Sequence, residues 1–158
     1  MNQGVDSPGS LRFVAGVDRQ AGALAWMPGL DGEGGDEGDG LHFWLVTSRR
    51  TARWVLPKGG IDAGMTPSEA AAQEALEEAG LTGIVADAPV GIYRMPKIRP
   101  PLIWTVEVEL YPMQVTHVAP SWLEQNQRQR RLVSLDEAHD LIAEPDILLI
   151  LRRFAAGL

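Results

Sequence analysis

Cysteine is absent from this sequence of 158 residues, which excludes disulfide bridges and thiolate metal sites. No apolar run approaches the roughly 20 residues that are needed to span a bilayer. The first residues, MNQGVDSPGSLRF, lack the basic start and the apolar block of a secretory signal. These absences predict a cytoplasmic protein that has no membrane partner.

Basic residues are outnumbered: 14 Lys and Arg stand against 21 Asp and Glu, for a formal net charge of -7. This balance excludes general nucleic-acid binding, which depends on neutralising phosphates with basic residues. Residues 59–93 contain acidic side chains but no Lys or Arg. The basic residues that flank this window are Arg49, Arg50, Arg53, Lys58, Arg94, Lys97 and Arg99. An acidic centre between basic flanks fits either a metal-assisted phosphate site or ordinary surface charge.

The chain length predicts one domain with an ordinary core. We expect a loose tail over residues 1–12 and a single domain over 13–158. A loop rich in glycine and acid is expected at 31–40, and irregular structure at 113–130. Strands are predicted at 22–28, 41–48, 53–56, 84–95, 101–112 and 131–134. Prolines in the segment PKIRP are expected to interrupt the pairing between the fourth and fifth of these. Helices are predicted after Thr66, after Ser134 and after Pro145, so the elements indicate a layered α/β domain.

The first predicted helix has clear start and stop signals. Thr66 caps it, Pro67 suits its first turn, and Gly80 ends it. At about 100° per residue, Glu74, Glu77 and Glu78 share one side of this helix. The opposite, packing side is expected to consist of Ala72, Ala75, Leu76 and Ala79, whereas Ala70 and Ala71 would leave room above the carboxylates.

Three carboxylates on one helical face repel each other by about 0.2–0.5 kcal/mol per pair, and no lysine or arginine of the helix offsets this. A solvated acidic face tolerates that cost, whereas a divalent cation would turn the repulsion into ligation. The preceding segment, LPKGG, adds Gly59 and Gly60, which let backbone approach a ligand closely. It also adds Lys58, which can reach a phosphate as a point charge.

These residues resemble the signature of the Nudix hydrolases, G-x5-E-x7-R-E-U-x-E-E-x-G-U, where U is a bulky apolar residue. Gly59 matches the opening glycine, and Glu74, Glu77, Glu78, Gly80 and Leu81 fall at the matching positions of this box, residues 59–81. Two positions depart from it, because Met65 replaces the first glutamate and Gln73 replaces the arginine. In the family, that glutamate and that arginine commonly pair with each other. We therefore interpret Met65 and Gln73 as a joint neutral replacement of the pair.

The resemblance continues outside the box. The segments RWVLPKGG, VGIY and RQRRLVSLDEA are similar to those of the branch that hydrolyses diadenosine polyphosphates and diphosphoinositol polyphosphates. The resemblance implies an α/β/α sandwich with a mixed β-sheet. It also implies Mg²⁺ or Mn²⁺ as cofactor and a small polyphosphorylated molecule as substrate.

By the same resemblance, Glu74, Glu77 and Glu78 would be catalytic metal ligands, joined by the carbonyl oxygen of Gly60. The residues expected to bind substrate are Arg53, Lys58, Gly59, Gly60, Arg49, Lys97 and Arg99. Arg128, Arg130 and Arg131 are assigned to a solvated surface, although an inositol polyphosphate would need such a cluster. Trp122 could stack on a base, but it is assigned to packing under a loop.

Three alternatives remain open. The chain could be a Nudix enzyme for another nucleoside diphosphate derivative, or a binding or regulatory domain of that fold without turnover. It could also be an unrelated domain whose acidic helix matches by chance. The apolar stripe of the C-terminal helix could pack within the domain or against a second copy in a homodimer.

Overall fold

The computed structural model describes residues 10–29 and 40–157, and the loop expected at 31–40 lies outside this part except for Gly40. Its strands are β1 (Arg12–Pro28), β2 (Leu41–Thr47), β3 (Trp54–Val55), β4 (Lys58–Gly60), β5 (Leu81–Val85), β6 (Gly91–Arg99), β7 (Leu102–Val118) and β8 (Arg130–Val133). Its helices are α1 (Pro67–Ala79), α2 (Leu135–Leu141) and α3 (Pro145–Ala156). The described part contains no helix that is long and apolar enough to cross a membrane.

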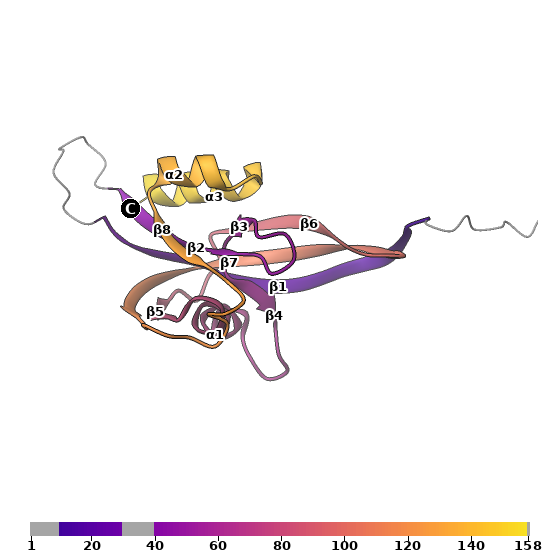
Figure 1. The fold of residues 1–158 in the computed structure, drawn as a ribbon, viewed down its shortest axis with the longest axis horizontal. Coiled ribbons are helices and arrows are strands. Elements are labelled where there is room, and N and C mark those ends of the chain that lie inside the picture. The colour runs from indigo at the N-terminus through magenta and orange to yellow at the C-terminus, as the bar shows by residue number, and fades with distance from the viewer. Residues whose placement is uncertain (1–9, 30–39, 158) are drawn as a thin grey trace, which may run out of the picture.

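The strands form one mixed sheet with the central order β3-β2-β1-β7-β5. Strands β1 and β7 pair in parallel. The pairs of β2 and β4 with β1, and of β5 and β6 with β7, are antiparallel. β8 pairs antiparallel with β2. Helix α1 covers one face of this sheet, and α2 with α3 covers the other (Figure 1). The fold is therefore the expected α/β/α sandwich.

Side chains along β1 point alternately to the two faces of the sheet and so contribute to both halves of the core. Ala21, Ala23 and Ala25 are fully buried in the cluster that faces α1, whereas Leu24 belongs to the cluster beneath α2 and α3. Small side chains on the α1 side let the helix approach the sheet closely. On the other side, Ile147 and Leu151 of α3 are buried, so the C-terminal stripe packs within the domain.

Several strand boundaries differ from those predicted. β1 begins at Arg12 and its first eight residues are exposed, which explains why burial patterns did not reveal them. β7 continues to Val118 through the segment expected to be irregular, because β5 pairs with its second half. The PKIRP segment does not interrupt pairing: Pro96 lies opposite Thr105 within β6. β6 pairs only with β7 among the described strands, and an edge strand is where a sheet tolerates proline.

Candidate functional site

Helix α1 begins and ends where the sequence predicts. The Thr66 hydroxyl accepts a hydrogen bond from the Glu69 N–H at 3.2 Å, and Gly80 ends the helix in the left-handed region at φ 67°. Its capping signals are therefore confirmed, and they fix which residues face the sheet.

The packing face of α1 differs from the predicted one. Ala70 and Ala71 are buried with Ala75, whereas Leu76 is 48% exposed. Glu78 lies in the middle of this buried face, with only 4% of its surface exposed. The prediction was correct for Ala75 and Ala79, which are fully buried. It was wrong for Leu76, because it gave the larger apolar residue to the core, whereas the sheet opposite is alanine-lined and accepts only small side chains. The carboxylates consequently sit at the junction of helix and sheet.

The turn that carries β4 encloses two of these carboxylates. A Cβ atom at Gly59 would overlap the carboxylate of Glu74, so only glycine leaves room for that side chain in its present position. Oε2 of Glu78 accepts a hydrogen bond from the Lys58 N–H at 3.4 Å. Residues 58–60 and the acidic side of α1 thus form one compact unit.

Burial perturbs the ionisation of this unit. Desolvation, reinforced by the neighbouring Glu77 and Glu124, raises the pKa of Glu74 to about 7. Desolvation also raises the pKa of Glu78 to about 8, despite the opposing charge of Arg128. Burial lowers the pKa of Lys58, whose ammonium donates to Oε1 of Gln20 at 3.4 Å. Burial therefore favours the neutral forms of Glu74 and Glu78 when no cation is bound beside them.

The donor set suits a hard divalent cation, although it is not pre-assembled. Within residues 10–29 and 40–157, no three acidic or histidine side chains converge to form a ready-made metal site. Glu77 instead accepts a hydrogen bond from Nε2 of Gln73 at 2.9 Å. The half-buried Glu74 and the buried Glu78 nevertheless border the 58–60 turn, and carboxylate oxygens are the ligands that Mg²⁺ and Mn²⁺ prefer.

A cleft of about 1000 Å³ opens above the carboxylates, and every residue predicted for the site lines it. The acidic members are Glu74, Glu77 and Glu78, and the others are Arg49, Arg53, Lys58, Gly59, Gly60, Lys97 and Arg99. Some of the basic side chains have partners: Arg53 pairs with Glu144 at 3.1 Å, and the Lys97 ammonium lies 5.9 Å from the centre of the Trp104 ring. The predicted residues are thus brought together around one concave surface.

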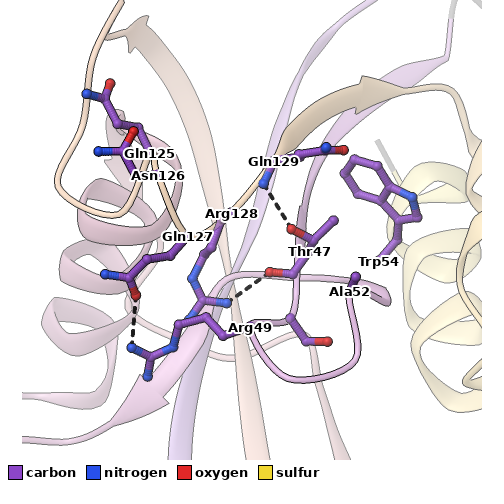
Figure 2. Close-up of a pocket in the computed structure, with 10 residues that line it drawn as sticks. Thr47, Arg49, Ala52, Trp54, Gln125, Asn126, Gln127, Arg128 and Gln129 are labelled. Carbon is purple, nitrogen blue, oxygen red and sulfur yellow. Dashed lines mark hydrogen bonds between the residues drawn. The ribbon is translucent and has the colours of Figure 1, made fainter.

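Arg128 is the main cleft residue that the sequence analysis missed, since it was assigned to a solvated surface. Its side chain is 9% exposed and contacts Glu78 at 3.0 Å and Glu124 at 3.1 Å. It also donates to the Thr47 carbonyl at 3.0 Å, as Figure 2 shows. The three carboxylates of α1 could have indicated such a residue. α1 itself contains no Lys or Arg, so a cationic partner for them has to come from another segment.

The other two arginines of that run differ from each other. Arg130 is partly buried, donates to the carbonyls of Ala79 and Ala119 at 2.7 Å, and stacks 3.9 Å from the Trp122 ring centre. It fixes the end of α1, so its assignment to solvent was also wrong. Arg131 is half exposed and pairs with Glu137 at 3.2 Å, as a surface residue would.

Comparison with known proteins gives a consistent set of matches. A family model described as NUDIX domain matches residues 35–154. Nudix hydrolase 18, mitochondrial, of Arabidopsis thaliana is 33% identical over 131 residues, covering 83% of this chain and 72% of the relative. Nudix hydrolase 12, mitochondrial, of the same plant is 30% identical over 105 residues, covering 64% of this chain. The chain spans about half the length of several curated relatives that it matches, 52% and 53% for two of them.

The fold also matches solved structures. The crystal structure of C. elegans Ap4A hydrolase aligns with a TM-score of 0.62 and covers 89% of this chain and 98% of that one. Its sequence identity is 19%, so this likeness concerns the arrangement of the sheet and helices alone.

Proposed function

Because this chain belongs to the Nudix family, we propose that it is a divalent-metal-dependent pyrophosphohydrolase. Its substrate is a small polyphosphorylated molecule of the diadenosine polyphosphate or diphosphoinositol polyphosphate type, and the bond cleaved is a phosphoanhydride. The observation that carries this proposal is the three-carboxylate face of α1 at the floor of a cleft with a basic rim. Acidic ligands below and cations around them suit a metal-bridged polyphosphate.

In this proposal Glu74, Glu77, Glu78 and the Gly60 carbonyl hold Mg²⁺ or Mn²⁺. An ion bound there would supply Lewis-acid chemistry, polarising the phosphoryl oxygen and lowering the pKa of the attacking water. Lys58, Arg49, Arg53, Lys97 and Arg99 bind the phosphate oxygens. Glu77, which accepts a hydrogen bond from Gln73, would join the other ligands through a change of side-chain rotamer.

Two further cleft residues complete the proposed machinery. Arg128 contacts the buried Glu78 and offers a guanidinium beside the carboxylates. Glu124 is the one carboxylate lining the cleft, among the described residues, that does not come from α1. We assign to Glu124 the role of accepting the proton from the attacking water, because it lines the cleft beside the carboxylates of α1 and is not one of the proposed metal ligands.

A binding or regulatory domain without turnover is the second candidate, and the departures at Met65 and Gln73 favour it. Neither residue lines the cleft, and the side chain of Gln73 contacts Glu77. The arrangement of the cleft therefore does not require these two residues. We therefore retain hydrolysis as the proposed function.

Product analysis by mass spectrometry tests the proposal. Diadenosine polyphosphates, diphosphoinositol polyphosphate, nucleoside triphosphates and nucleotide sugars are each incubated with the protein, with and without Mg²⁺. We expect metal-dependent cleavage that is lost in Glu77→Gln and retained in Glu69→Gln, an exposed glutamate in the first turn of the same helix. Glu124→Gln should lose cleavage but retain Mn²⁺ binding. Metal-dependent binding without any cleavage would favour the regulatory domain instead.

A further inference from the structure

Gln20 is a buried polar residue of β1 that lines the cleft. Only 7% of its surface is exposed, and it precedes a run of buried residues without polar side chains, AGALA. A buried amide is costly unless it is hydrogen-bonded, so its presence here needs a specific reason. We propose that Gln20 is a positioning residue, which holds the Lys58 ammonium in the cleft and leaves its charge available to a substrate phosphate. This inference rests on the proposed function, because it concerns the same cleft.

The register of the sheet brings these two side chains together. β4 pairs antiparallel with β1, and Lys58 lies opposite Gly22. Gln20 is two residues before Gly22, so its side chain points to the same face of the sheet and is a diagonal neighbour of Lys58. A Cβ atom at Gly22 would lie 3.2 Å from Cβ of Lys58 and 3.0 Å from the Pro57 carbonyl oxygen. Glycine at this position therefore permits the close approach that puts Lys58 within reach of Gln20.

Both ends of the Gln20 amide have partners whose chemistry fixes its orientation. Oε1 accepts a hydrogen bond from Nζ of Lys58 at 3.4 Å, and Nε2 donates to Oδ2 of Asp18 at 3.5 Å. An ammonium can only donate and a carboxylate can only accept, so the reversed amide would lose both bonds. The side chain is therefore anchored at Asp18 and directs its oxygen at Lys58.

Gln20 gives Lys58 a neutral partner. Another cation of the cleft, Arg53, instead pairs with the carboxylate of Glu144 at 3.1 Å. Lys58 forms no ion pair with any of the described residues, and it is its backbone N–H that donates to Glu78. A carbonyl acceptor orients an ammonium without cancelling its charge. The full charge of Lys58 can therefore attract a phosphate oxygen.

A positioning partner matters at this site because lysine has a flexible four-carbon stem. Lys58 is half-buried and lines the cleft beside Glu74 and Glu78. Its bond to Gln20 is longer than the usual length of about 2.9–3.0 Å, so it orients the ammonium more than it immobilises it. Without Gln20 the ammonium has no side-chain acceptor among the described residues. It would then have to be ordered by the substrate itself, at a cost in affinity.

Methylenediphosphonate, a non-hydrolysable analogue of pyrophosphate, tests the proposal without turnover. Its affinity is measured by calorimetry in the presence of Mg²⁺ for the wild type, Gln20→Leu and Gln20→Glu. Leucine is of comparable size and removes the acceptor, whereas glutamate keeps an acceptor oxygen and adds a negative charge. Gln20→Leu is also combined with Lys58→Met and, as a matched control, with Lys97→Met. Lys97 is a second lysine of the cleft, and its ammonium lies over the Trp104 ring instead.

We expect Gln20→Leu to weaken the diphosphonate by roughly tenfold, as the loss of a bond that orients a charged group should. In the Lys58→Met background the same change should alter the affinity by less than about twofold, whereas in Lys97→Met it should keep its effect. Gln20→Glu should melt close to the wild type and still bind the probe more weakly, because its carboxylate neutralises the ammonium. In the cleavage assay, Gln20→Leu should raise KM and change kcat less.

Equal effects of Gln20→Leu with and without the Lys58 ammonium would show that Gln20 does not act through Lys58. Wild-type affinity in Gln20→Glu would show that the neutral charge of the partner is irrelevant. Either result, or failure of the wild type to bind the probe, would overturn the inference and leave the proposed hydrolysis to its own test by product analysis. Absence of cleavage together with the expected binding changes would overturn the hydrolysis and keep the role of Gln20 in phosphate binding.

Discussion

Arg128 and Glu78 form an ion pair of 3.0 Å between Nη2 and Oε1, and their side chains are only 9% and 6% exposed. The two residues lie 50 positions apart in the chain, one before β8 and the other in α1. The same guanidinium bonds Glu124 and the Thr47 carbonyl. Arg128 therefore ties the segment preceding β8 to the acidic helix and to β2 at once.

Removal of this guanidinium should destabilise the fold. We expect Arg128→Gln to lower the free energy of unfolding by about 2–3 kcal/mol, because buried bonds to a charged donor are lost and their acceptors stay behind. Arg131→Gln is the matched control, since its pair with Glu137 is half exposed and should be worth under about 1 kcal/mol. Urea titration of both variants measures the difference. Equal losses for the two would show that Arg128 is not a structural tie.

The raised pKa values of Glu74 and Glu78 predict a specific pH dependence in the absence of divalent metal. The unfolded carboxyls titrate near 4.5, whereas the folded ones do so at about 7 and about 8. Between these limits the folded state binds more protons, so stability falls as pH rises. We expect the melting temperature of the wild type to fall from pH 5 to pH 8 relative to that of Glu78→Gln. Mg²⁺ should oppose the fall. Parallel curves for the two proteins would contradict this assignment.

The sequence was sufficient where a local rule decides the structure. Thr66 and Gly80 set the ends of α1 through capping alone, and the spacing of Glu74, Glu77 and Glu78 directed attention to the helix that lines the cleft. Strands with alternating burial, such as β7 around Val106 and Val108, were also recognised. In these cases the determining interactions lie within a few residues of each other.

The missed features depend on segments that are distant in sequence. Leu76 was assigned to the core because its size suggests burial, but the alanines of β1 decide which side of α1 fits against the sheet. Arg128 looks like one of several arginines in a polar run until the fold brings it to Glu78. The exposed half of β1 carries no periodic burial signal, because it pairs with β7 without packing beneath a helix. Tertiary contacts decide each of these outcomes.

Met65 and Gln73 should behave as a coupled pair if they replaced a glutamate and an arginine together. Both side chains are half-buried, at the entry to α1 and in its middle turn. Met65→Glu alone introduces a carboxylate without a cationic partner and should destabilise the protein, whereas Gln73→Arg alone keeps the Glu77 carboxylate within reach and should cost less. We expect the double variant to recover at least about 1 kcal/mol relative to the sum of the single changes, measured by urea unfolding in a double-mutant cycle. Additivity within about 0.5 kcal/mol would refute the coupling.

Gly59 and Gly60 are adjacent in β4, yet they should respond differently to the same substitution. A Cβ at Gly59 would overlap the carboxylate of Glu74, whereas a Cβ at Gly60 meets nothing within 4 Å. The overlapping atoms are the far end of a flexible side chain, so Gly59→Ala should move that carboxylate at a stability cost of under about 1 kcal/mol. We therefore expect Gly59→Ala to weaken Mn²⁺ binding and hydrolysis at least roughly tenfold, the effect of about 1.4 kcal/mol.

Gly60→Ala keeps its carbonyl oxygen and should bind Mn²⁺ as the wild type does. Paramagnetic resonance titration of free Mn²⁺ measures both variants, and thermal melts verify that each remains folded. Shortening the displaced side chain gives a second check, because Gly59→Ala with Glu74→Asp leaves more room beside the new methyl group. Partial recovery of Mn²⁺ affinity in this double variant would tie the loss to the Glu74 carboxylate. Equal affinity for Gly59→Ala and Gly60→Ala would mean that the carboxylate position set by Gly59 is not the one that holds the metal.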